Sequence, residues 1–126
     1  MRELQVLMID DQAADTVAAQ SAFTRLGCRV ETARGKRALA TLAKRRFDLV
    51  CLDPGDPCAS DVLARLAPGQ YAAALGGLGT DLPARFNGVL TRPVTPFLAA
   101  VTVAMAIMTK ADTGSRAHTG DQGLAA

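Results

Sequence analysis

The sequence predicts an α/β domain in which helices cover both faces of a five-stranded parallel sheet, an arrangement called doubly wound. Two observations predict it: short apolar runs alternate with segments whose apolar residues recur at helical spacing, and only a few residues connect one element to the next. The 126 residues suit one domain, and the contents of 49% hydrophobic and 21% charged residues are typical of a globular chain. We expect a domain over residues 1–110 and a disordered tail over residues 111–126.

Three strands and two helices are expected in the first half of the chain. Their ranges, in chain order, are 5–9, 15–26, 28–33, 35–46 and 47–52. The first run, QVLMI, is continuously apolar, as expected for a strand that is buried on both faces. Gly27 follows the first helix, at a position where glycine commonly ends a helix, and the second helix has a basic outer side.

The second half of the chain shows a weaker version of the same alternation. The expected elements are a short helix, two strands and a final helix, at residues 61–66, 71–75, 88–90 and 95–108. Together with the first half, they predict a sheet with the flavodoxin-like strand order 2-1-3-4-5. In such a sheet, ligands bind beyond the carboxyl ends of the strands, where the strand order reverses.

Acidic residues stand at two of these strand ends. Asp10 and Asp11 follow the first strand, and Asp53 follows the third, its expected neighbour in the sheet. Carboxylates this close repel one another, and a divalent cation such as Mg²⁺ would compensate their charge. Arg92, at the end of the fifth strand, adds a fixed positive charge. Such a pocket is suited to receive a phosphoryl group.

The residues around these acids resemble the receiver domain of two-component response regulators. The resemblance covers about residues 4–109 and is carried by VLMIDD at 6–11, DLVCLD at 48–53, Pro57, and NGVLTRP at 87–93. It implies that Asp53 is the phospho-acceptor and that Mg²⁺ is held by Asp10, Asp11, Asp53 and the backbone carbonyl of Gly55. It also implies that Arg92 contacts the phosphoryl group, followed by a cis-proline at Pro93.

The chain departs from the family pattern at several positions. Arg92 replaces the family's lysine, Gly76 stands where the family has Ser or Thr, and Val89 stands where it has a switch aromatic. Arginine keeps the positive charge but is planar and bulkier than lysine. The interval from Asp53 to Arg92 is short for the family, so we expect the fourth helix to be shortened or missing.

The last helix is expected to provide an interaction surface. Residues 93–109 contain no charged side chain, whereas a helix that packs on a sheet by one face should have a polar outer side. We expect a homodimer or a docked partner protein to cover this helix, with the interface at Phe97, Val101, Val103, Met105 and Ile107. The alternative is a helix of small residues that tolerates exposure to water.

Two functions agree with these observations. The first is a stand-alone receiver of a phosphorelay, in which a histidine kinase or phosphotransfer protein phosphorylates Asp53 and the product signals through protein contacts. The alternative is a degenerate pseudo-receiver, a binding or dimerisation module that does not depend on phosphorylation; Gly76 and Val89 favour it. An enzyme is not expected beyond weak autophosphorylation and autodephosphorylation, because an aspartyl phosphatase needs a second acid where this chain has Gly55.

The remaining composition argues against other classes of function. Cys28, Cys51 and Cys58 include no C-x-x-C pair, and His118 is the single histidine, so neither a zinc site nor a Ser-His-Asp triad is expected. Eight of the 14 Lys and Arg lie between Arg25 and Arg46, which we interpret as a solvated helix face and not as a nucleic-acid site. No signal peptide or membrane span is expected, which favours a cytoplasmic location.

Overall fold

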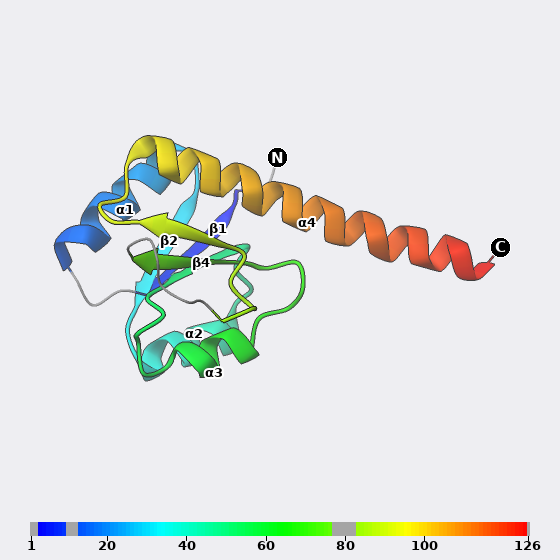
Figure 1. Ribbon diagram of the computed structural model, residues 1–126, viewed down its shortest axis with the longest axis horizontal. Coiled ribbons are helices and arrows are strands. Elements are labelled where there is room, and N and C mark those ends of the chain that lie inside the picture. The colour runs from blue at the N-terminus through cyan, green and yellow to red at the C-terminus, as the bar shows by residue number, and fades with distance from the viewer. Residues whose placement is uncertain (1–2, 10–12, 77–82, 126) are drawn as a thin grey trace.

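The computed structural model describes residues 3–9, 13–76 and 83–125 and confirms the predicted sheet. All strand pairs are parallel, and the strand order is β2-β1-β3-β4-β5. The strands are β1 (Gln5–Ile9), β2 (Arg29–Ala33), β3 (Leu49–Leu52), β4 (Tyr71–Gly76) and β5 (Gly88–Thr91). The helices are α1 (Ala13–Arg25), α2 (Lys36–Lys44), α3 (Ala59–Ala64) and α4 (Pro96–Ala125). Figure 1 shows α1 and α4 on one face of the sheet and α2 and α3 on the other.

The apolar runs build two hydrophobic cores, one on each face of the sheet. Successive side chains of a strand point to opposite faces. Val6 and Met8 of β1 therefore pack in the core beneath α1 and α4, whereas Leu7 and Ile9 pack in the core above α2 and α3. All four side chains are fully buried, so the uninterrupted apolar character of this strand is explained by burial on both faces.

The connection between β4 and β5 lacks a helix over its described residues, 83–87, which form a turn. This agrees with the expected loss or shortening of a fourth helix. Side-chain hydrogen bonds hold the connection in place. The Asn87 Oδ1 accepts the Ala72 N–H at 2.8 Å, and Arg85 donates to the carbonyls of Ala67 and Gln70 at 2.8 and 2.9 Å. Partial burial lowers the pKa of the Arg85 guanidinium, but five donors in a fixed fork still suit it to bind several carbonyls.

Helix α4 extends farther than the sequence predicts. The expected helix ends at residue 108, followed by a disordered tail, but α4 continues to Ala125 and projects beyond the sheet (Figure 1). Glycines in this segment suggested a tail, yet the segment after Pro96 contains no proline, the residue that most strongly breaks a helix. Within the described residues, no helix combines the length and the apolar character needed to cross a bilayer.

An ion pair ties α4 to the amino-terminal edge of the sheet. The Lys110 Nζ lies 2.8 Å from Oδ1 of Asp48, whose side chain is only 5% exposed. The backbone N–H of Gln5 donates to the other Asp48 oxygen, also at 2.8 Å. A buried carboxylate is stable only when it is paired and hydrogen-bonded, so this contact fixes where the helix leaves the domain.

The three cysteines belong to the packing of the domain. All are free thiols; Cys28 and Cys51 are buried and Cys58 is partly buried. Burial raises the pKa of both buried thiols, with smaller contributions from the negative charge of Asp48 on Cys28 and from Cys28 on Cys51. A raised pKa keeps a thiol protonated and unreactive. The two buried cysteines therefore act as small hydrophobic residues in the packing of the domain.

We expect thiol reactivity to follow burial. A small aromatic disulfide reagent at mildly alkaline pH should modify Cys58 first and should reach Cys28 and Cys51 only when the protein unfolds, because their raised pKa values and their burial both suppress reaction. Peptide mapping of the labelled native protein checks this order. Fast labelling of Cys51 in the folded protein would contradict the structure.

Close packing of Gly88 against Tyr71 gives a second prediction. A Cβ atom on Gly88 would overlap the hydroxyl oxygen of the buried Tyr71 side chain. Gly88→Ala should therefore reduce the free energy of unfolding by about 1–3 kcal/mol in urea denaturation. Tyr71→Phe removes the clashing oxygen, so the loss caused by Gly88→Ala should shrink in that background. An equal loss in both backgrounds would show that the overlap is not the cause.

Candidate functional site

The carboxyl ends of the strands define the candidate site. Ile9 and Leu52, the last residues of β1 and β3, are partners in the register of this parallel pair. Asp53 follows Leu52, so it stands beside the point where the chain leaves β1. Asp10 and Asp11, the two other predicted carboxylate ligands, follow Ile9 in the sequence and lie outside the described residues.

Asp53 and Arg92 come together as the sequence predicts. The Arg92 Nη2 donates to Asp53 Oδ2 at 3.3 Å, and the two residues are 39 positions apart in the chain. The Arg92 side chain is 15% exposed and that of Asp53 is 37% exposed, so the carboxylate remains accessible to solvent. The Arg92–Pro93 peptide bond is cis, as the resemblance implies.

The backbone of the loop after β3 contacts the Asp53 carboxylate. The Gly55 N–H donates to Asp53 Oδ1 at 2.8 Å, and a Cβ atom on Gly55 would lie 3.3 Å from the same oxygen. Glycine thus allows the backbone to approach the carboxylate closely. Asp56 Oδ1 accepts the Cys58 N–H at 2.8 Å, which gives this extra acid a structural role at the start of α3. A hollow of about 150 Å³ is lined by Asp53, Gly55, Asp56 and Pro57.

The donors in this loop fit a hard cation. Mg²⁺ prefers carboxylate and carbonyl oxygens and keeps several waters. Asp53 offers a carboxylate and Gly55 a carbonyl in the same short loop, although both Asp53 oxygens already accept a hydrogen bond. Among the described residues, no group of three acidic, histidine or cysteine side chains could hold a metal. A magnesium site at this loop would therefore need further ligands, for which the resemblance implies Asp10 and Asp11.

The two altered switch positions lie on β4 and β5. Gly76, the last residue of β4, pairs with Thr91 and has a φ of 155°, a backbone conformation that other residues rarely adopt. Open space surrounds the position where its Cβ would lie, so the conformation and not crowding favours glycine. Val89 is 43% exposed on β5. Neither residue offers the hydroxyl or aromatic ring of the family pattern.

The predicted interface residues divide between the surface and the core. Phe97, Val101, Met105 and Ile107 are exposed hydrophobic side chains of α4. Val103, in contrast, is partly buried and packs against the core beneath α4, which corrects its assignment to the outer surface. Helical periodicity explains the difference, because Val103 lies four residues from the buried Ala99 and therefore on the same side of the helix.

Sequence comparison and structural comparison give different results. No protein-family model matches the chain, and no curated protein sequence does. Solved structures match it well. The signal receiver domain of an HD domain-containing protein from Pseudomonas fluorescens Pf-5 has a TM-score of 0.77 at 23% identity, covering 92% of this chain and 95% of that one.

Two further receivers have the same fold. Chemotaxis response regulator CheY4 of Vibrio cholerae has a TM-score of 0.71 at 21% identity, covering 83% of this chain and 99% of that one. A CheY-like receiver domain protein from Methanospirillum hungatei JF-1 has a TM-score of 0.75 at 18% identity, covering 89% and 99%. The chain therefore has the fold of response-regulator receiver domains.

Proposed function

We propose that this chain, which has the receiver-domain fold, accepts a phosphoryl group on Asp53 from a histidine kinase or a phosphotransfer protein. The observation that carries the proposal is the contact between Asp53 and Arg92 at the carboxyl edge of the sheet, where ligands of doubly wound folds bind. The partly exposed carboxylate is accessible to a donor, and the guanidinium is positioned to balance added negative charge.

The proposed reaction is the transfer of a phosphoryl group between two proteins. A carboxylate oxygen of Asp53 attacks phosphorus, the bond from phosphorus to the donor's imidazole nitrogen breaks, and the electron pair of that bond returns to the imidazole. The product is an acyl phosphate on Asp53. Arg92 would bind its oxygens, and the Gly55 N–H, which contacts the carboxylate already, would orient the acceptor.

Magnesium is part of this proposal. Asp53 and the carbonyl of Gly55 would hold the ion together with Asp10 and Asp11, and the bound ion would neutralise charge on the acids and on the phosphoryl oxygens. The three free thiols agree with a reducing compartment, so we propose that the reaction takes place in the cytoplasm.

A degenerate receiver is the second candidate function. Gly76 has no hydroxyl to bind a phosphoryl oxygen, and Val89 has no ring to change position after phosphorylation. In this alternative, Asp53 would remain in its ion pair with Arg92 and would not be phosphorylated. Partner binding would then not depend on phosphate. The two candidates differ in one measurable property, the formation of an acyl phosphate on Asp53.

Intact-mass spectrometry distinguishes these candidates. With Mg²⁺ and a small phosphodonor such as acetyl phosphate, the chain should gain the mass of one phosphoryl group. Asp53→Asn should gain none, and a chelator should prevent the gain. Arg92→Gln should reduce the yield or lifetime of the adduct, because it removes the charge that is 3.3 Å from the acceptor. The absence of an adduct on the folded wild-type chain would favour the degenerate receiver.

We also propose that the chain forms a homodimer through the outer side of α4. Phe97, Val101, Met105 and Met108 recur every three or four residues and are 74%, 45%, 44% and 63% exposed, so they form one apolar stripe. Such a stripe loses contact with water when a second copy packs against it.

Sedimentation equilibrium tests the dimer. Met105→Glu should shift the chain toward monomer, because a dimer would bury the new charge without a partner. Val17→Glu is the matched control, since Val17 is an exposed apolar residue on α1 that lies outside the stripe. A wild-type chain that stays monomeric at high concentration, or equal effects of both substitutions, would contradict the proposal.

A further inference from the structure

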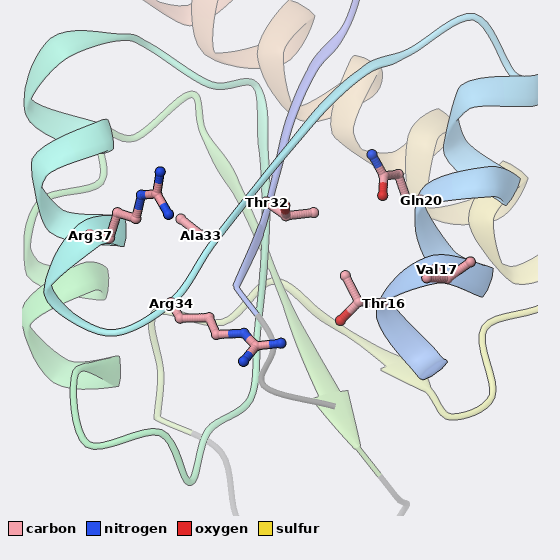
Figure 2. A pocket seen from close by; sticks show the side chains of 7 residues that line it. All are labelled: Thr16, Val17, Gln20, Thr32, Ala33, Arg34 and Arg37. Carbon is pink, nitrogen blue, oxygen red and sulfur yellow. The ribbon is translucent and has the colours of Figure 1, made fainter. Parts of the chain in front are cut away.

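A second pocket lies beside β2, an edge strand of the sheet. It has a volume of about 330 Å³ and opens between α1 and the connection from β2 to α2 (Figure 2). Its polar lining consists of Thr16 and Gln20 from α1, Thr32 from β2, Arg34 from the connection and Arg37 from the first turn of α2. None of these residues lines the hollow around Asp53.

Among the described residues, the lining is cationic and contains no acidic side chain. Figure 2 shows the Arg34 side chain directed into the space between the β2–α2 connection and α1, where its guanidinium faces Thr16. Arg37 lies on the α2 side of the same pocket. Both arginines are exposed, and in the described part of the chain neither has an ion pair or a side-chain hydrogen bond. The described residues around the pocket thus supply no counter-charge for these two guanidinium groups.

The start of α2 adds to this positive charge. Arg34, Lys36 and Arg37 lie within four positions, the first turn contains no acidic residue, and no side chain caps the helix at Gly35. The amino-terminal end of a helix carries partial positive charge, so cations there are unfavourable. A bound anion would reverse the sign of this interaction.

A second basic groove, in contrast, is accounted for by the fold itself. It is lined by Lys44, Arg45, Arg46 and Arg65, near the carboxyl-terminal ends of α2 and α3, where cations are favourable. Arg45 also pairs with Glu31 at 3.2 Å and stacks on the ring of Phe47. Arg34 and Arg37 of the β2 pocket have no comparable contact with the described residues.

We infer that the β2 pocket binds a small phosphorylated molecule through Arg34. A planar guanidinium can donate two parallel hydrogen bonds to a phosphate, and Arg37 supplies the second positive charge for a dianionic phosphate monoester. The Thr32 hydroxyl and the Gln20 amide provide donors and acceptors for the rest of the molecule. The volume suits a small ligand of about nucleoside monophosphate size. This inference does not depend on phosphorylation of Asp53.

Amide chemical shifts provide the test. Inorganic phosphate and adenosine monophosphate are titrated separately into the ¹⁵N-labelled full chain, with a chelator present to exclude metal-dependent binding near Asp53. Both should cause saturable shifts at Thr16, Gln20, Thr32 and Arg34, and the monophosphate should bind more tightly. Arg34→Gln should weaken binding about tenfold or more, since a charge-assisted hydrogen bond is lost, and Arg37→Gln should weaken it less.

Two control variants distinguish binding in this pocket from general attraction to positive charge and from binding at Asp53. Arg29→Gln removes the same charge at the opposite end of β2 and should leave the affinity nearly unchanged. Asp53→Asn should also leave it unchanged, which separates this pocket from the proposed phosphorylation site. The inference is overturned if neither probe shifts these amides in the folded chain, if Arg29→Gln weakens binding as much as Arg34→Gln, or if succinate binds as tightly as the monophosphate.

Discussion

The parallel pairing of β1 with β3 is the constraint on which both the fold and the candidate site depend. Its register places Ile9 beside Leu52, so β1 and β3 end at the same level of the sheet. Asp53 therefore follows β3 beside the point where β1 ends. A slip of one residue would turn the side chains of β1 to the opposite faces and exchange the contents of the two cores. Because those side chains are fully buried, the packing of the cores also holds the acceptor in place.

The contact between Arg92 and Asp53 joins the third and fifth strands across the end of the strand between them. The guanidinium neutralises the charge of the unphosphorylated carboxylate, and it would bind the added phosphoryl oxygens after phosphorylation. One side chain would thus serve both the unphosphorylated and the phosphorylated form. The same contact underlies the degenerate alternative, since a permanent ion pair satisfies the acceptor without phosphate. Gly76 and Val89 leave this ion pair without the hydroxyl and the ring that accompany it in the family pattern.

The strands and the residues that stand at strand ends could be predicted from local patterns, whereas contacts without such a pattern could not. Apolar runs predicted the strands, and the strand ends predicted that Asp53 and Arg92 meet. Val103 was assigned to the surface because an uncharged helix does not show which side faces the core. The pair of Asp48 with Lys110 joins residues 62 positions apart and has no sequence signature. The β2 pocket was missed because its cations were interpreted as one solvated helix face.

A crystal structure of the wild-type chain grown with saturating Mg²⁺ and beryllium fluoride is the decisive test of the proposed phosphorylation site. We expect an octahedral ion in contact with the Asp53 carboxylate and the Gly55 carbonyl, together with a beryllium fluoride group on Asp53 whose fluorines contact Arg92. An Asp53 side chain that binds neither the ion nor the phosphoryl analogue, and retains only its ion pair with Arg92, would contradict it.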